Sequence, residues 1–280
     1  MSARTYAGRG YRRRMKGIGA VLIDIDGVLT VSWKALPGAV EAMERLRAAG
    51  IPLVLVTNTT SRTRAAVAER LAGEGFPVGI GDILTAPAVT AAYLREHHPN
   101  ARCRLINTGD VREDLAGVEI VGEGAGDEDR GAPDVIVFGG AGEAFSYPAL
   151  NSAFRCLQRG ARLVAMHRNL YWRTADGLDL DTGAFLPGLE RAAGVEATVT
   201  GKPAEAFFAT ALAHLGAPAA EALMVGDDIE SDVLAAQRSG ITGVLVKTGK
   251  YLPETHRAAE GTPDHVLDSF AGLPGLLGLP

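Results

Sequence analysis

The sequence contains little of what would build a disulfide framework or a thiolate metal site. Only two cysteines, Cys103 and Cys156, occur among its 280 residues, and they do not form a CxxC motif. Two separated cysteines are typical of a protein from a reducing compartment, so we expect a cytoplasmic protein without structural disulfides. With so few cysteines and no larger histidine cluster, a zinc site is not expected either.

The chain also lacks a strong excess of one charge and a long apolar run. Its formal net charge is only -5 at pH 7. No uninterrupted apolar stretch approaches the roughly 20 residues that a helix needs to cross a bilayer. We therefore expect neither nucleic acid nor a membrane as a partner.

Acidic residues are missing altogether from residues 1–16, which carry several Lys and Arg residues. The apolar segment that follows, 18–23, is too short for the core of a signal peptide. We interpret 1–16 as a disordered basic tail, or as a mis-assigned start with Met15 as the true first residue.

What the sequence does contain is a regular alternation of apolar runs and helical patterns. The run 20–23 is short and partly β-branched, which favours a buried strand over a helix. A helical pattern at 37–49 ends at a glycine, a second buried strand covers 51–56, and Ser61 or Thr63 can cap the next helix. This order predicts a parallel α/β sheet with right-handed crossovers.

The same alternation returns in the last third of the chain. The elements expected there are helices at 203–215 and 232–238 and strands at 222–225 and 244–246. The segment between the two halves has its own strands and helices, so we expect a second α/β unit inserted into the first. We place this insert at 85–187, which leaves 17–84 and 188–280 for the first unit.

Two aspartates end the first predicted strand. Alternate residues of a strand share a face, so Asp24 and Asp26 point the same way. Two neighbouring carboxylates that leave a core together repel each other and are poorly solvated. A divalent cation is the usual way to offset that cost.

Three further polar segments follow predicted strands of the first unit. Ligands of open α/β sheets bind at the carboxyl edge of the strands, where these segments would meet. Acids can hold a cation there, a hydroxyl and backbone amides can hold anionic oxygens, and a lysine adds a positive charge. Together they predict a phosphoryl-transfer site. The segments are Thr57-Asn58, Gly201-Lys202-Pro203, and Asp227-Asp228 with Asp232.

In this order, the four segments match the four motifs of the haloacid dehalogenase superfamily. The resemblance implies a Rossmann-like parallel-sheet core with an inserted α/β cap domain of the larger, C2 type. Three other segments resemble sequences from one branch of this superfamily. That branch includes phospholysine phosphohistidine inorganic pyrophosphate phosphatase and haloacid dehalogenase-like hydrolase domain-containing protein 2. They are Leu84–Ala88, Gly142–Tyr147 and Val246–Tyr251.

The resemblance also implies the catalytic roles of the acids. Asp24 would be the nucleophile that forms an aspartyl-phosphate, and Asp26 would be the general acid and base. Mg²⁺ would be held by Asp24, the backbone carbonyl of Asp26, and Asp227. Asp228 and Asp232 would contribute through water or from outside the ligand set.

The remaining motif residues would bind the phosphoryl oxygens: the Thr57 hydroxyl, the Asn58 amide and Lys202. The expected activity is hydrolysis of a small phosphorylated molecule, with pyrophosphate and phosphoramidates as branch-specific candidates. Two alternatives stay open. One is a phosphotransferase or mutase with the same intermediate, and the other is a receiver-like signalling protein phosphorylated on aspartate.

A cap usually closes over the site and reads the leaving group. The segment after one cap strand is the candidate reading loop, with His167, Arg168, Asn169 and Tyr171 as possible hydrogen-bonding residues. It departs from the Asn-x-Asp sequence that is common near this position in capped phosphatases, which argues against a named sugar or vitamin substrate. Capped members of the family are often homodimers, and the resemblance therefore implies a homodimer.

Overall fold

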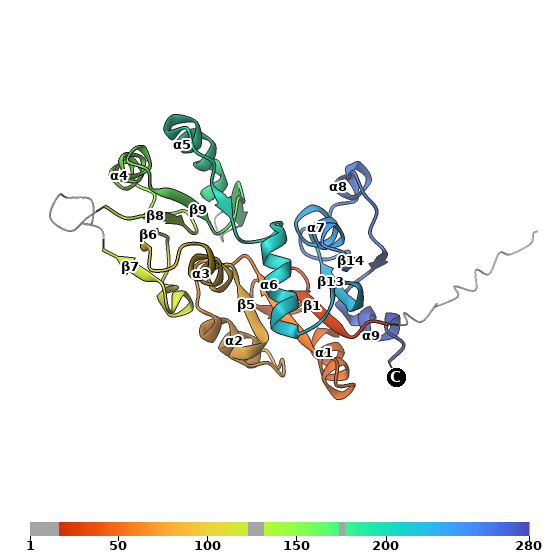
Figure 1. Ribbon diagram of the computed structural model, residues 1–280. Coiled ribbons are helices and arrows are strands. Elements are labelled where there is room, and N and C mark those ends of the chain that lie inside the picture. The colour runs from red at the N-terminus through yellow and green to blue at the C-terminus, as the bar shows by residue number, and fades with distance from the viewer. Residues whose placement is uncertain (1–16, 123–131, 174–176, 280) are drawn as a thin grey trace, which may run out of the picture.

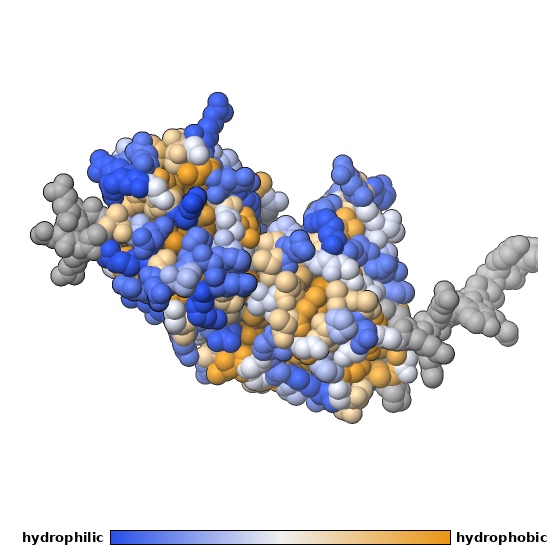
Figure 2. Space-filling view, viewed as in Figure 1, coloured by the Kyte–Doolittle hydropathy of each residue, from blue (hydrophilic) through white to orange (hydrophobic). Residues whose placement is uncertain are grey.

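The computed structural model describes residues 17–122, 132–173 and 177–279. The expected basic tail, 1–16, lies outside the described residues. Figure 1 shows two lobes, each built on a sheet, with α3 and α6 near their junction. In Figure 2 a notch separates the two lobes on the side of α7 and α8, and hydrophilic side chains cover much of the surface around α4 and α5.

The first lobe is built on a six-stranded parallel sheet in the order β15-β14-β13-β1-β4-β5. Its strands are β1 (Ala20–Asp24), β4 (Leu53–Thr57), β5 (Ile83–Thr85), β13 (Ala222–Gly226), β14 (Thr242–Val246) and β15 (His265–Leu267). Residues of β1, β4 and β13 are buried on both faces, as their unbroken apolar runs require. The parallel α/β fold expected from the alternation is confirmed.

Helices cover both faces of this core sheet. On one face Val21 and Ile23 pack with α1 (Ala39–Ala48) and α2 (Arg64–Gly73), near the short C-terminal helix α9 (Leu273–Leu276). On the other face Leu22 packs with Phe207 and Phe208 of α6 (Glu205–Leu215) and with α7 (Ala235–Arg238). Helix α8 (Pro253–Ala258) follows β14. Burial of apolar surface on both sides therefore fixes β1 at the centre of the domain.

The second lobe is a five-stranded parallel sheet in the order β12-β9-β8-β6-β7. Its strands are β6 (Arg102–Ile106), β7 (Glu119–Val121), β8 (Val135–Phe138), β9 (Arg162–Ala165) and β12 (Thr198–Val199). Helices α4 (Tyr147–Gln158) and α5 (Leu186–Ala193) cover one face, and α3 (Ala86–His97) lies on the other. A separate hairpin pairs β10 (Tyr171–Arg173) with β11 (Leu178–Leu180).

This second sheet continues past residue 187, where we expected the insert to end. Strand β12 pairs with β9, with Thr198 opposite Val164, and α5 packs against α4. At two residues, β12 is too short to show as an apolar run in the sequence. The connection back to the core sheet therefore starts after Val199, directly before the Gly201-Lys202 segment.

Short elements complete the fold. Strands β2 (Thr30–Val31) and β3 (Lys34–Ala35) form a hairpin immediately after the Asp26 loop. The 3₁₀ segments are η1 (Ile80–Asp82), η2 (Arg112–Leu115), η3 (Thr182–Ala184), η4 (Ala219–Glu221) and η6 (Phe270–Gly272), and η5 (Ile229–Leu234) is a π-helix. Within the described ranges, we find no helix with the length and apolar character to cross a bilayer.

Candidate active site

Polar residues from distant parts of the chain form one buried cluster at the carboxyl edge of the core sheet. Asp24 closes β1, Thr57 closes the neighbouring β4, and Asp227 follows β13 directly. The ammonium of Lys202 lies 2.5 Å from Asp24 Oδ1 and 2.7 Å from Asp232 Oδ1. The parallel sheet therefore brings together the side chains that the sequence placed at separate strand ends.

Three carboxylates form the acidic side of this cluster. Oxygen atoms of Asp24, Asp227 and Asp232 lie within 4.8 Å of one another, and all three residues are buried. The π-helix η5 turns Asp232 back over the end of β13, where Gly226 leaves it room. A Cβ atom at Gly226 would lie 2.3 Å from the Cβ atom of Asp232. Only glycine therefore fits at the end of this strand.

Burial and mutual repulsion disturb the protonation of these acids. Burial raises the pKa of Asp227 to about 8, with a further rise from the charges of Asp24 and Asp232. Burial also raises the pKa of Asp232 to about 6, although Lys202 opposes the rise. The pKa of Asp24 is raised in the same way. Burial alone would lower the pKa of Lys202, but Asp232 and Asp24 outweigh it and keep the ammonium charged.

Two lysines, Lys202 and Lys250, face three carboxylates, so the ionised cluster keeps a negative charge, and its oxygen donors fit Mg²⁺. Lys202 engages Oδ1 of Asp24 and of Asp232, while Oδ2 of Asp227 accepts the Lys250 backbone N–H at 2.6 Å. Oδ1 of Asp227 can therefore face a cation, and the Asp24 oxygen that Lys202 holds keeps a second lone pair for the same ion. Mg²⁺ binds through one or two carboxylates and keeps several waters, which suits this small set of hard oxygen donors.

Two glycines fix the position of Asp227. Gly27 and Gly249 lie next to each other against its carboxylate, and a Cβ atom on them would lie 1.8 Å and 1.9 Å from Asp227 Oδ2. Both have positive φ, 87° and 59°, which glycine adopts without strain. The Thr248 hydroxyl also donates to the Gly27 carbonyl at 2.5 Å. The loops after β1 and β14 are thereby held together over the acidic cluster.

The second motif is linked to the third by a pair of hydrogen bonds. The Asn58 side chain accepts from the Lys202 backbone N–H and donates to the Lys202 carbonyl, both at 2.9 Å. This carboxamide therefore positions the lysine. The buried Thr57 hydroxyl accepts from the Thr59 N–H at 3.0 Å, so its own hydrogen remains available to donate.

Comparison with known proteins identifies the family of this chain. A family model described as haloacid dehalogenase-like hydrolase matches residues 21–121, and a second HAD-hydrolase-like model matches residues 199–273. The chain is 38% identical to haloacid dehalogenase-like hydrolase domain-containing protein 2 of Bos taurus, over 92% of this chain and 94% of that relative. The chain belongs to the haloacid dehalogenase-like hydrolase family.

Two other relatives of this hydrolase carry more specific names. Phospholysine phosphohistidine inorganic pyrophosphate phosphatase of Xenopus laevis is 36% identical, over 93% of this chain and 95% of the relative. The solved structure of a p-nitrophenyl phosphatase from Archaeoglobus fulgidus superposes with a TM-score of 0.84 at 31% identity, and covers 94% of this chain and 99% of that chain. The expected family, the Rossmann-like core with a cap, and the enzyme class are confirmed.

In this hydrolase the two remaining motif acids have different surroundings. Asp26 keeps an exposed surface, yet nearby protein atoms remove it partly from water and raise its pKa, against the opposing charges of Lys250 and Lys202. The carboxylate of Asp228 instead accepts the backbone N–H groups of Glu230 and Ser231 at the start of η5. Burial would raise the pKa of Asp228, but these hydrogen bonds and Lys250 hold it below its usual value.

Lys250 is a site residue that the sequence reasoning did not single out. Its backbone N–H binds Asp227, and its side chain is exposed beside the acidic cluster. Burial would lower the pKa of Lys250, but the charges of Asp24 and Asp227 raise it. One signal was available: Lys250 closes a Lys-Thr-Gly-Lys segment directly after β14, at the same edge of the sheet as the four motifs.

The first residue of the expected reading loop, His167, is buried with an acidic partner. His167 Nε2 lies 3.8 Å from Asp181 Oδ2, and His167 Nδ1 accepts the Asn169 N–H at 3.3 Å. Burial lowers the pKa of His167, Asp181 opposes that change, and Lys250 of the core adds to it. His167 is therefore a buried loop residue that Asp181 and Asn169 hold in place. Asp181 had no signal in the sequence.

The other three residues of that loop face different surroundings. The Arg168 guanidinium pairs with Glu190 of α5, so it is engaged within the second lobe. This contact and the Glu190 charge raise the pKa of Arg168 against the effect of burial. Asn169 is half-buried, and Tyr171 on β10 is exposed. Of the four, Tyr171 is the side chain most open to solvent.

Proposed function

We propose that this hydrolase is a Mg²⁺-dependent phosphatase that moves a phosphoryl group from a small molecule first to Asp24 and then to water. The observation that carries the proposal is the position of Lys202, whose ammonium bridges Asp24 and Asp232 beside Asp227. Because Lys202 holds Oδ1 of Asp24, Oδ2 of the same carboxylate is oriented as the nucleophile. Preorganised charge of this kind is the main source of catalysis in phosphoryl transfer.

The reaction then follows in two steps. In the first, Asp24 Oδ2 bonds to phosphorus while the bond from phosphorus to the leaving atom breaks, and Asp26 gives its proton to that atom. The raised pKa of Asp26 favours the protonated carboxyl that this step needs. In the second step Asp26 takes a proton from water, the resulting hydroxide bonds to phosphorus, and the bond to Asp24 breaks. Phosphate leaves and Asp24 is regenerated.

The other motif residues have supporting roles in this proposal. The Thr57 hydroxyl, the Asn58 backbone N–H and Lys202 donate to the phosphoryl oxygens. Asp24, the Asp26 carbonyl and Asp227 would hold Mg²⁺, with Asp232 and Asp228 outside the ligand set. When bound, Mg²⁺ supplies the positive charge that allows an anionic carboxylate to approach an anionic phosphoryl group.

We propose pyrophosphate or a phosphoramidate as the substrate class. One similar protein is named phospholysine phosphohistidine inorganic pyrophosphate phosphatase. Lys250 supports the idea from this chain's own residues, because its charge lies at the exposed side of the acidic cluster, where a leaving group would emerge. A second phosphate as leaving group would gain from that charge, whereas an apolar leaving group would not.

We further propose that the cap comprises residues 86–199, from α3 through β12, and that it closes over the leaving group. Tyr171 is the cap residue best placed for that role because it is exposed, while His167, Arg168 and Asn169 orient the loop. Free, buried Cys103 and Cys156 support the cytoplasm as the compartment. The proposal of a homodimer rests on the family resemblance alone. Sedimentation velocity would test this oligomeric state.

The nucleophile assignment is tested with Asp24→Asn. We expect this variant to lose at least about a thousandfold of the Mg²⁺-dependent turnover of p-nitrophenyl phosphate, because the amide neither attacks phosphorus nor balances Lys202. The matched control is Asp268→Asn, since the Asp268 side chain is 94% exposed and follows the edge strand β15, three strands away from β1 in the core sheet. Wild-type turnover by Asp24→Asn would refute the assignment.

The same assay separates the alternative functions. A substrate panel of pyrophosphate, phosphoramidates and sugar phosphates, each with Mg²⁺, should favour the first two. A phosphotransferase would instead transfer the group to an added alcohol acceptor in preference to water. A receiver-like protein would be labelled stoichiometrically by acetyl phosphate without turnover. Preference for a sugar or nucleotide monophosphate would contradict the substrate class and leave the reaction type intact.

A further inference from the structure

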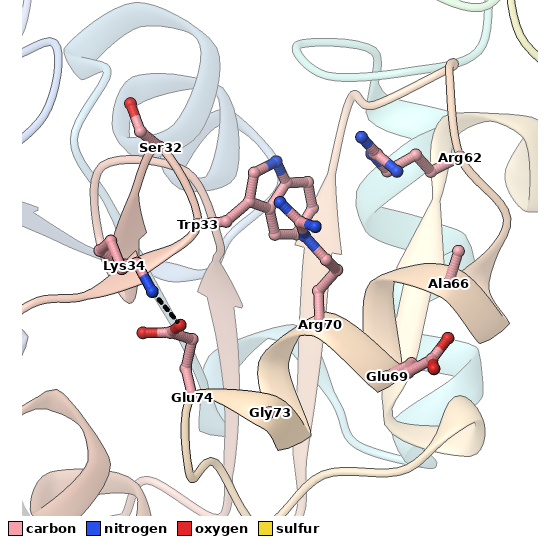
Figure 3. Close-up of a pocket in the computed structure, with 9 residues that line it drawn as sticks. All are labelled: Ser32, Trp33, Lys34, Arg62, Ala66, Glu69, Arg70, Gly73 and Glu74. Carbon is pink, nitrogen blue, oxygen red and sulfur yellow. Dashed lines mark hydrogen bonds and ion pairs between the residues drawn. The ribbon is translucent and has the colours of Figure 1, made fainter.

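A groove separate from the acidic cluster lies between the β2–β3 hairpin and helix α2. Its volume is about 580 Å³, and Trp33 stands between its two walls. Figure 3 shows the guanidinium groups of Arg62 and Arg70 turned toward the indole of Trp33. Their Cζ atoms lie 5.6 Å and 5.4 Å from the ring centroid, which is the range of a cation–π contact. The groove therefore presents two guanidinium groups on one aromatic surface.

Among the described residues that line this groove, three cations face two carboxylates, so one positive charge is in excess. Lys34, at one wall, is paired with Glu74 at 2.9 Å. Neither Arg62 nor Arg70 forms an ion pair with a described carboxylate, although Glu69 lines the same groove. Two like charges held on one ring repel each other, and an anion bound between them would relieve that repulsion.

The backbone of the hairpin places Trp33 in this position at a cost. Ser32 and Trp33 have positive φ angles of 50° and 63°, the geometry of a turn that normally carries Asn or Gly. A bulky aromatic residue keeps such a conformation only where its surroundings fix it. The indole is half-buried against the core cluster, so one of its surfaces is anchored while another forms the groove wall.

We propose that this groove is a binding site for an oligophosphate, held by the guanidinium groups of Arg62 and Arg70. Guanidinium groups offer paired N–H donors that match phosphate oxygens, and stacking on Trp33 orients both of them before the ligand arrives. The groove volume is ample for a chain of two or three phosphates. The site goes beyond the proposed phosphatase reaction, because none of its residues belongs to the acidic cluster.

Both walls of the groove are continuous with catalytic loops. The hairpin starts at Thr30, which pairs with Asp26 in an isolated bridge, and Arg62 lies in the segment that follows Thr57. A bound oligophosphate would therefore order the two segments that carry the general acid and the phosphate-binding hydroxyl. It could be a free effector or the far end of a substrate that also reaches Asp24, because the two share the same phosphate chemistry.

Binding is tested with tripolyphosphate and the fluorescence of Trp33. The full-length Trp172→Phe protein, in which Trp33 is the remaining tryptophan, is titrated without divalent metal, so that no turnover occurs and the carboxylate cluster repels the probe. We expect a saturable change in emission. Arg62→Gln/Arg70→Gln should weaken binding at least about tenfold, and Arg62→Lys/Arg70→Lys should fall between, because lysine keeps the charge and loses the paired donors.

The control variant is Lys34→Gln/Glu74→Gln, which removes both partners of that ion pair and keeps the net charge of the groove, so its affinity should stay within about twofold of the parent. Isothermal titration calorimetry on the same variants provides a readout that does not depend on the indole. Absence of binding by both methods, or equal affinity in the double glutamine variant, would overturn the proposal. Competition with p-nitrophenyl phosphate in the presence of Mg²⁺ would identify the ligand as the far end of a substrate. Lack of competition would identify it as an effector.

Discussion

Individual residues around the acidic cluster differ in what they can do for the substrate, and Lys250 is the clearest case. Lys202 is buried, and its ammonium is paired with Asp24 and Asp232. The Lys250 side chain is instead exposed to solvent near the same acids. A charge in that place can act on a leaving group that arrives from solvent. At the residue scale, Lys250 is therefore the best candidate for selecting an anionic leaving group.

This idea makes a prediction about two substrates. Lys250→Gln should lower kcat/KM for pyrophosphate by about tenfold and change that for p-nitrophenyl phosphate little, since one well-placed charge contributes roughly 1–2 kcal/mol to an anionic leaving group. Lys247→Gln is the matched control, because Lys247 belongs to the same loop and pairs with Asp268 at 3.1 Å. Equal losses on both substrates would mean that Lys250 supports the cluster in general.

Gly27 permits a second prediction. Gly27→Ala would put a Cβ atom 1.8 Å from Asp227 Oδ2 and force that carboxylate to move. We expect an at least tenfold higher Mg²⁺ concentration for half-maximal activity, besides roughly 1–2 kcal/mol of lost stability for a positive-φ alanine. Gly50→Ala has the same backbone cost, with φ of 68°, but meets nothing within 4 Å. The Mg²⁺ dependence of Gly50→Ala should match that of the native enzyme. If both variants need more Mg²⁺, the effect does not come from displacement of Asp227 by the new Cβ atom.

At the scale of elements, one buried carboxylate connects the second lobe to the core. Asp114 of η2 accepts the backbone N–H of Arg64, the first residue of α2, at 2.8 Å and the Arg64 Nε–H at 3.0 Å. It also accepts the Thr85 hydroxyl at 3.1 Å, at the end of β5. A negative charge at the start of a helix is favourable as well. Asp114 therefore fastens η2 to a core helix and a core strand.

This connection between the second lobe and the core can be tested by removing the Asp114 carboxylate. Asp114→Ala should lower the free energy of unfolding by about 2 kcal/mol, because three donors at a buried position lose a charged acceptor. Asp110→Ala is the control: its exposed carboxylate accepts only the Arg112 N–H at 3.1 Å, among the contacts that the described residues make with it. Urea unfolding of both variants measures the difference. An Asp114→Ala protein as stable as the control would show that the lobes are joined by packing alone.

Elements also show where sequence reasoning succeeded and where it could not. The strands β1, β4 and β13 are long apolar runs, so their existence, direction and polar ends were predictable. Strand β12 has two residues and no periodic signal, and it became visible only through its pairing with β9. The second sheet therefore extends beyond residue 187, the end that the sequence predicted for the insert.

Long-range contacts were likewise beyond the reach of spacing. The pair Asn58–Lys202 joins residues 144 positions apart, and Thr248–Gly27 joins residues 221 positions apart. The motif pattern predicts that these segments share an edge, but not which atom of Asn58 binds the lysine loop. No sequence motif marks the groove at Trp33. A turn with two positive-φ residues normally carries Asn or Gly, so Ser32-Trp33 gives no sign of such a turn.

On the scale of the whole molecule, the acidic cluster makes stability depend on pH. Aspartate in an unfolded chain titrates near pH 3.9. In the metal-free fold, burial and neighbouring charges raise the pKa of Asp227 to about 8 and that of Asp232 to about 6. Between the unfolded and folded values, the folded state holds protons that the unfolded state has released. Its stability is therefore greatest on the acid side and falls as the pH rises.

The size of this effect can be measured by thermal unfolding. From pH 6 to pH 8 in EDTA, Asp227 alone should lower the free energy of unfolding by about 1.4 kcal/mol per pH unit, and the melting temperature by several degrees. Saturating Mg²⁺ should reduce the fall, because the cation replaces the protons on the same oxygens. In Asp227→Asn the fall in EDTA should be smaller than in the native chain, since the amide does not titrate. If the fall is equal in Asp227→Asn and the native chain, and unaltered by Mg²⁺, then the pH dependence arises elsewhere and this cluster is not a cation site.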